Sequence, residues 1–135
     1  LYNREICSYH LSRRPNSEMV ATMLSQAVAQ LGAQKPMLHP DQGVLYRCRA
    51  YRAQLAEAEI TQSMSRKGNC WDNAPMESFF AVLKTECFHN RTFASIEALE
   101  AEIHEYIRYY NHDRLSLKLK KLSPVAYRTQ FATAA

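Results

Sequence analysis

Two carboxylates occupy positions where a folded chain could bring them together. Asp41 follows a short apolar run, in the sequence His-Pro-Asp-Gln-Gly of residues 39–43, and Glu77 follows Pro75 at the predicted start of a helix. The two acids are separated by 35 residues. Mg²⁺ in proteins is usually held by one or two carboxylates, with water and substrate phosphate completing its shell. The pair therefore predicts a two-metal site for phosphoryl transfer.

The surroundings of each acid suit this chemistry. Asp41 comes just after a predicted strand, and ligands of open α/β sheets lie at the carboxyl ends of strands. A helix start favours the ionised form of Glu77, which a metal ligand requires. Lys84 lies seven residues after Glu77, so it shares a helix face with it and could hold a phosphate. Each acid also has an ordinary explanation, because Asp-x-Gly occurs in common turns and acids are frequent at helix starts.

Apolar periodicity and capping residues predict the elements that position these acids. Asn16 or Ser17 should cap a helix over 17–31 that Gly32 ends, and Ser95 should cap a helix over 96–111. Strands are expected at 4–13, 36–39 and 59–64, further helices at 47–58, from Pro75 onward and from Ser123 onward, and a loop at 65–75. Alternating strands and helices indicate an α/β architecture.

Composition narrows the class of protein. The chain has 135 residues, which suits one domain, and its net charge of +4 is compatible with nucleic acid without requiring it. No apolar run approaches the length of a membrane span. The four cysteines, Cys7, Cys48, Cys70 and Cys87, form no Cys-x-x-Cys pair, so we expect reduced thiols in a cytoplasmic protein. The first residues contain neither a starting Met nor a signal peptide, and we expect the chain to begin inside a domain.

The sequence contains two clusters of basic residues, and each has two possible roles. Arg47, Arg49 and Arg52 fall on the predicted helix 47–58. A lysine run follows the helix 96–111 at Lys118, Lys120 and Lys121. A solvated face is the default for both, and phosphate contact is the alternative. For the lysine run, the tyrosines that precede it also suit a nucleic-acid surface.

Three motifs together resemble a bacterial insertion-sequence transposase of the group related to retroviral integrases. Residues 71–80, Trp-Asp-Asn-Ala-Pro-Met-Glu-Ser-Phe-Phe, resemble the motif of its third acid, and residues 39–46, His-Pro-Asp-Gln-Gly-Val-Leu-Tyr, that of its second. Residues 109–114 and 122–127, which contain Tyr-Tyr-Asn and Leu-Ser-Pro-Val-Ala-Tyr, resemble the C-terminal signature. The interval of 35 residues between the acids is also the spacing of the group.

The resemblance implies a ribonuclease-H-like integrase core with an Asp-Asp-Glu metal site. Asp41 would be the second acid and Glu77 the third, and both would hold Mg²⁺ or Mn²⁺, two ions in the intact protein. Arg66, Lys67, Asn73 and Lys84 are the candidate DNA contacts. The partners implied are the DNA of the element ends and target, and further copies of the chain. We expect residues 1–94 to form a partial catalytic core and residues 95–135 its C-terminal helical extension.

The first Asp of the group should lie about sixty residues before Asp41, as the resemblance implies, and this chain has no such position. The other aspartates, Asp72 and Asp113, cannot take that role. We therefore expect an N-terminally truncated core, without the first strand or strands, that binds metal weakly and turns over no DNA. The alternative is a catalytically silent module for DNA binding or dimerisation, whose bared strand edge could pair with a second copy.

Overall fold

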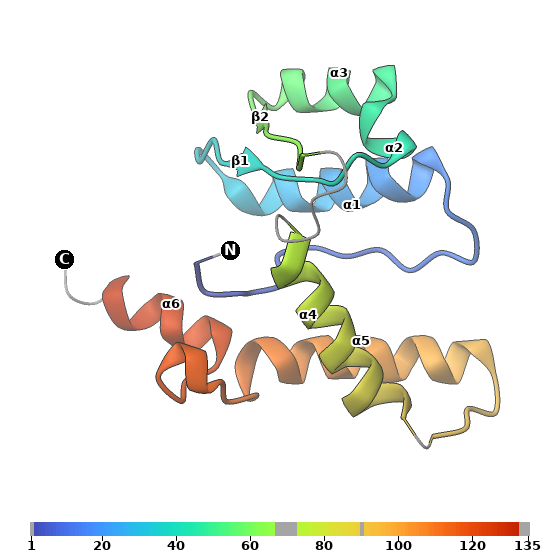
Figure 1. Ribbon diagram of the computed structural model, residues 1–135, viewed down its shortest axis with the longest axis vertical. Coiled ribbons are helices and arrows are strands. Elements are labelled where there is room, and N and C mark those ends of the chain that lie inside the picture. Colours follow the sequence, from blue (N-terminus) through green and yellow to red (C-terminus); the bar gives the residue numbers. More distant parts are fainter. Residues whose placement is uncertain (1, 67–72, 90, 133–135) are drawn as a thin grey trace. The chain divides into compact units, whose positions relative to one another are not determined.

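The computed structural model describes residues 2–66, 73–89 and 91–132 (Figure 1). The chain forms two compact units. One is Cys7–Ala74, and the other combines Leu1–Ile6 with Pro75–Ala135. These units divide the chain at residues 6/7 and 74/75, whereas the boundary that we expect between core and extension, at 94/95, stays a prediction. None of the helices in the described ranges is long and apolar enough to cross a membrane.

The first long helix of the Cys7–Ala74 unit begins and ends as local chemistry predicts. Helix α1 spans Ser17–Leu31, and the Asn16 side chain accepts a hydrogen bond from the Met19 N–H at 2.8 Å. Gly32 ends the helix at φ +57°, a conformation that glycine adopts without steric cost. The prediction of a helix over 17–31 is confirmed.

Two short parallel strands follow, joined by helices. Strand β1, Met37–Leu38, pairs with β2, Thr61–Gln62, and Met37 lies opposite Thr61. The expected strands at 36–39 and 59–64 are thus present but shorter. The expected helix at 47–58 is divided into α2, Val44–Arg47, and α3, Arg49–Glu57, because Cys48 is extended with ψ 152°.

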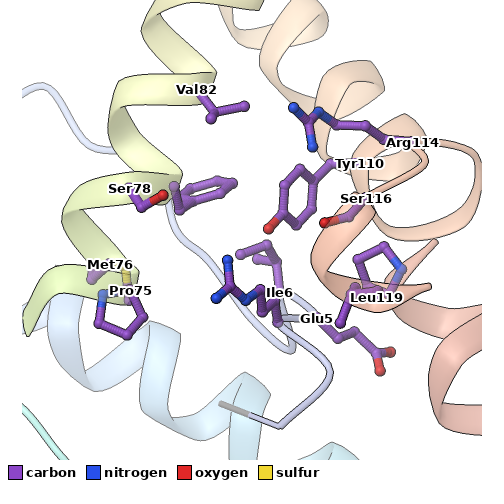
Figure 2. A pocket seen from close by; sticks show the side chains of 13 residues that line it. Glu5, Ile6, Pro75, Met76, Ser78, Val82, Tyr110, Arg114, Ser116 and Leu119 are labelled. Atoms are coloured by element: carbon purple, nitrogen blue, oxygen red, sulfur yellow. The ribbon is translucent and has the colours of Figure 1, made fainter. Parts of the chain in front are cut away.

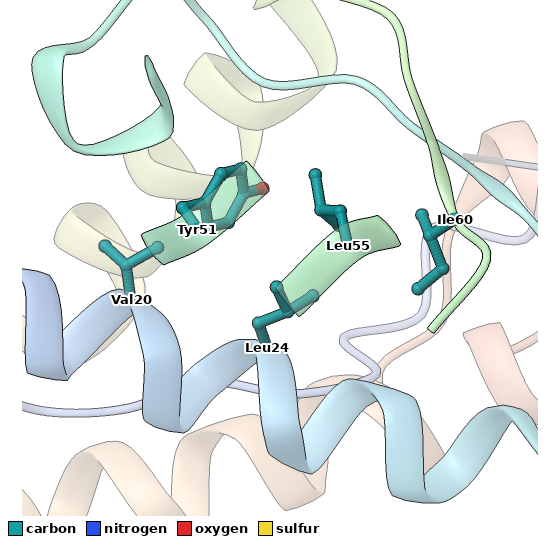
Figure 3. Close-up of a cluster of buried hydrophobic side chains, with 5 residues drawn as sticks. All are labelled: Val20, Leu24, Tyr51, Leu55 and Ile60. Atoms are coloured by element: carbon teal, nitrogen blue, oxygen red, sulfur yellow. The ribbon is translucent and has the colours of Figure 1, made fainter. Parts of the chain in front are cut away.

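A small apolar core holds this unit together (Figure 3). Val20 and Leu24 of α1 meet Tyr51 and Leu55 of α3 and Ile60 before β2, and each side chain is at most 8% exposed. Complete burial of one such aliphatic side chain contributes roughly 1.5–3 kcal/mol. The core therefore fixes the β1–α3–β2 crossover on α1, which in turn positions the residues after β1.

The other unit is helical in its described residues. Helix α4, Ala74–Leu83, continues into a π-helical turn, η2, Lys84–Phe88. Helix α5, Ile96–His112, is capped by the Ser95 hydroxyl, which accepts from the Ala98 N–H. A 3₁₀ turn, η3, Leu117–Leu119, leads into α6, Pro124–Ala132. The predicted helices at 96–111 and after Ser123 are confirmed, and Pro75 lies in the first turn of α4 as expected.

The prediction of a strand over 4–13 is wrong, because these residues form no strand. A strand needs a neighbouring backbone edge, and the sheet in the described ranges contains β1 and β2 alone. The N–H of Ile6 instead donates to Asn111 Oδ1 at 2.9 Å, and its carbonyl accepts from Asn111 Nδ2 at 3.0 Å. Arg4 has φ +57°, which also departs from a strand.

Candidate active site

Asp41 lies on an exposed turn three residues after β1. Its Oδ1 accepts a hydrogen bond from the Gly43 N–H at 2.7 Å. A Cβ added at Gly43 would lie 2.8 Å from that oxygen and 3.3 Å from the Tyr46 ring, so a side chain there would displace the carboxylate. Asp41 in turn contributes to raising the pKa of Tyr46, although burial of the Tyr46 ring is the larger cause. The turn therefore holds the acid in one orientation.

The segment after β2 packs against the Asp41 turn. The Ser65 N–H donates to the Pro40 carbonyl at 3.0 Å, and Gln42 Nε2 donates to the Ser65 carbonyl at 2.7 Å. Ser65 is 3% exposed. Asn73 Nδ2 lies 3.4 Å from the Ser65 hydroxyl oxygen, so the structure brings Asn73 close to the Asp41 turn. The two parallel strands thus end at a common edge.

Sequence reasoning missed Gln42 and Ser65 as organising residues. Their sequence positions carry only a weak signal, since Gln42 stands inside the Asp-Gln-Gly turn and Ser65 precedes a basic stretch. Arg66 follows the buried Ser65 directly and is exposed. Lys67 lies outside the described residues.

Glu77 lies in the first turn of α4, two residues after Pro75. It is exposed, and within the described ranges its carboxylate makes no hydrogen bond or ion pair. The helix dipole favours a negative charge at this end. Lys84, also exposed, begins η2, roughly 10 Å further along the helix axis. The chain thus offers a carboxylate and an ammonium group about two helical turns apart.

The described side chains fit a hard divalent cation better than a soft one. In the described part of the chain, no three His, Cys, Asp or Glu side chains form a cluster that could hold a metal. Cys7, Cys48 and Cys87 are not in disulfides, and burial raises the pKa of Cys87, which makes it a poor ligand. Asp41 and Glu77 offer carboxylate oxygens, which Mg²⁺ and Mn²⁺ prefer, while water and phosphate can supply the remaining ligands. Asp41 belongs to the Cys7–Ala74 unit and Glu77 to the other.

An apolar pocket of about 130 Å³ lies within the second unit (Figure 2). Met76, Phe79 and Val82 of α4 line one side, and Tyr110 and Leu119 line the other. The candidate site residues do not line this pocket. Three charged residues line it: Arg114 pairs with Glu86, Glu5 pairs with Arg128, and Arg4 is the third. Because neither Asp41 nor Glu77 lines it, the pocket is not part of the candidate site.

Comparison with known protein families decides the relationship. The integrase core domain family matches residues 1–70, and a second integrase core domain family matches residues 77–131. The chain belongs to the integrase core domain family. The first match contains Asp41 and the second begins at Glu77.

Individual relatives support the same family. The chain is 56% identical over 130 residues to an uncharacterized transposase-like protein of Haemophilus influenzae, and the match covers 96% of this chain and 60% of that protein. It is 53% identical over 131 residues to a putative transposase for the insertion sequence element IS150 of Escherichia coli, covering 96% of this chain and 46% of that protein. The chain thus spans about half the length of these relatives. The resemblance to insertion-sequence transposases is confirmed.

A solved structure supports the same fold. The integrase core superposes on a chain of the simian T-cell lymphotropic virus intasome with a TM-score of 0.62, at 19% identity, over 78% of this chain and 37% of that chain. This likeness confirms the expected ribonuclease-H-like integrase fold. The described residues contain more helix and less strand than the sequence pattern predicts, because β1 and β2 are only two residues each. The absence of the first strand or strands stays a prediction.

Proposed function

We propose that this integrase core is part of an insertion-sequence transposase, which cleaves DNA strands at element ends and transfers them into target DNA. The observation that carries the proposal is the position of the two acids. Each lies exposed at the end of an element, Asp41 after β1 and Glu77 at the start of α4, inside a segment that matches the integrase core. Transposase relatives at 53–56% identity support the same conclusion.

Asp41 and Glu77 are the proposed metal ligands. Mg²⁺ or Mn²⁺ held by them would activate water or a 3′-hydroxyl as nucleophile and stabilise the leaving oxygen, as two-metal sites do. The Gly43 N–H orients Asp41 by holding one of its oxygens, which leaves the other for coordination. Glu77 lies in the first turn of α4, where the helix dipole favours a negative charge.

Arg66, Lys67, Asn73 and Lys84 are the proposed DNA contacts near these ligands. Asn73 and Arg66 adjoin Ser65, which packs against the Asp41 turn, and Lys84 follows Glu77 along the same helix. Lys67 is included from the sequence alone. A lysine beside the metal ligands would neutralise phosphate charge as DNA enters.

For the chain as it stands, we propose weak metal binding and no useful turnover. A two-metal site of this type needs a third carboxylate, and the resemblance supplies no residue for the first Asp. Association with further copies and location in the cytoplasm are proposed from the similarity to insertion-sequence transposases. A cleavage assay in which the isolated chain cuts DNA, and in which Glu77→Gln abolishes the cutting, would overturn this part.

Manganese binding tests the ligand assignment. We expect crystals soaked in Mn²⁺ to show one ion touching Asp41 and Glu77, whose carboxylates would lie within roughly 4 Å of each other because each ligand bond is about 2.1 Å. In solution, Asp41→Asn and Glu77→Gln should each lower Mn²⁺ affinity. Glu57→Gln, an exposed acid on α3, serves as the control. Equal affinity of all three variants would refute the assignment.

A silent DNA-binding or dimerisation module remains the alternative. The open edges of the two-stranded sheet in the described residues favour it, since an unpaired strand edge can add a strand from a second copy. Divalent-metal dependence of DNA binding separates the two functions, because electrostatic binding alone weakens with salt but needs no Mg²⁺. Light scattering would detect the dimer.

A further inference from the structure

The C-terminal end of the chain has an unbalanced charge. Residues 114–135 contain five basic side chains and no acidic one. The two arginines of this range form ion pairs with residues outside it: Arg114 pairs with Glu86, and Arg128 pairs with Glu5. The three lysines, Lys118, Lys120 and Lys121, all fall within the connection between α5 and α6. The lysines at this end of the chain are therefore concentrated on one short stretch.

This stretch, residues 116–122, is a closed turn that we call the lysine loop. The Ser116 N–H donates to the Leu122 carbonyl at 3.1 Å, and the Lys121 N–H donates to the Ser116 carbonyl at 2.9 Å. The Leu119 side chain is 3% exposed, so the loop is held by one buried apolar residue. All three lysines are exposed. The loop thus presents three ammonium groups from a backbone that is already ordered.

The backbone of the lysine loop is unusual at two consecutive residues. Lys120 has φ +56° and ψ +36°, and Lys121 has φ +61°, so both are left-handed. Glycine adopts this conformation freely, whereas a residue with a Cβ is strained in it. Strained backbone that the surrounding structure maintains is found most often at functional sites. Lysine in place of glycine at both positions indicates that the side chains have a use that offsets the strain.

We propose that the lysine loop binds the phosphate backbone of duplex DNA. A DNA duplex carries one negative charge per roughly 1.7 Å of its axis, so three ammonium groups within four residues can reach adjacent phosphates. Such contacts position a duplex without sequence specificity. The inference rests on the proposed function for the choice of DNA as the anion. It adds a second surface, separate in sequence from Asp41, Glu77 and the proposed contacts around them.

A charge-matched comparison tests the proposal. The lysine-loop variant carries Lys118→Gln, Lys120→Gln and Lys121→Gln. The control variant carries Arg13→Gln, Arg14→Gln and Lys35→Gln, which change three exposed basic residues of the Cys7–Ala74 unit. Binding of a labelled duplex of mixed sequence is measured by anisotropy over a series of salt concentrations, in EDTA. We expect the lysine-loop variant to lose at least about tenfold in affinity and its salt slope to fall by roughly 2 to 3, about 0.9 per phosphate contact.

Three outcomes would overturn the proposal. The first is an equal loss in the control variant, and the second is no duplex binding by the unaltered chain. The third is an unchanged duplex affinity together with lost binding to vesicles that contain phosphatidylserine, which would assign the loop to a lipid surface. Failure of the proposed function is distinguishable, since it would appear as Mn²⁺ binding that is insensitive to Asp41→Asn and Glu77→Gln.

A second variant separates the role of the charge from folding. Lys120→Gly with Lys121→Gly relieves the left-handed strain and removes two charges. We expect this variant to have a higher urea midpoint than the unaltered chain and a weaker duplex affinity. If the lysines only shaped the turn, stability and binding would change in the same direction or binding would stay constant, and either result would overturn the proposal.

Discussion

Glu86 and Arg114 form a bidentate ion pair that joins η2 to the segment that follows α5. Arg114 Nε lies 2.8 Å from Glu86 Oε2 and Nη2 lies 2.6 Å from Oε1, while the Tyr106 hydroxyl donates to Oε2 at 2.8 Å. Arg114 also lies over the Tyr110 ring, 5.8 Å from its centroid. These contacts hold η2, the π-helical turn that follows α4, against α5 and the segment after it.

The stability of the second unit should depend on the charge of Glu86. The Arg114 guanidinium lowers the pKa of the Glu86 carboxyl in the folded state. A lowered folded pKa stabilises the fold above the unfolded value, about 4.3, and this contribution is lost as pH falls through the folded pKa. Glu86→Gln should therefore lower the unfolding free energy by about 1 kcal/mol near neutral pH, with the difference from the unaltered chain shrinking in acid.

Urea unfolding at neutral and acidic pH measures this difference. Glu105→Gln is the matched control, because Glu105 pairs with Arg108 on the exposed surface of α5, where solvent screens the ion pair and its loss should change stability little. A gap between Glu86→Gln and the unaltered chain that grows toward low pH would contradict the assigned role of the pair.

Asn111→Leu should release the segment around Ile6. The Asn111 amide makes two hydrogen bonds to the Ile6 backbone, at 2.9 and 3.0 Å, and the leucine side chain can make neither. We expect a loss of about 1–3 kcal/mol in unfolding free energy and faster hydrogen exchange at the Ile6 amide. Gln26→Leu, an exposed amide side chain on α1, should leave that exchange unchanged. Unaltered protection of Ile6 in the Asn111 variant would show that other contacts hold the segment.

Tyr51→Phe and Tyr106→Phe should have opposite effects. Burial raises the pKa of Tyr51 to about 12, and its hydroxyl is buried with no hydrogen-bond partner in the part of the chain that the structure describes. Removing that oxygen should leave the unfolding free energy unchanged or raise it by up to about 1 kcal/mol. Tyr106→Phe deletes a donor to Glu86 and should cost about 1–2 kcal/mol. Equal losses in the two variants, measured by thermal unfolding, would mean that Tyr51 has a partner in solution.

Gly43→Ala should weaken metal binding although every proposed ligand remains. The added Cβ would lie 2.8 Å from Asp41 Oδ1, and the φ of Gly43, −56°, is one that alanine accepts. We expect Mn²⁺ affinity to fall roughly tenfold or more, as when a partner that orients a ligand is lost. Gly32→Ala is the control, since its added Cβ meets no atom within 4 Å, Asp41 included, although it adds strain at φ +57°. Calorimetric titration that gave both variants the same affinity would disprove the role of the turn.

Elements whose contacts are local could be predicted from the sequence. Helices α1 and α5 begin where Asn16 and Ser95 cap them, because each cap bonds to an N–H three residues away. Their apolar stripes are also local patterns. The two acid motifs, their spacing and the C-terminal signature together predicted the integrase family, which the comparisons confirm.

Features that depend on distant partners could not be predicted in this way. The residues around Ile6 have strand-forming side chains, but a side chain 105 residues away supplies their backbone partners and no strand forms. Ser65 and Gln42 join only because β1 and β2 are parallel. In each case a hydrogen bond between segments overrides the local preference of the backbone, so the tertiary fold alone determines the outcome.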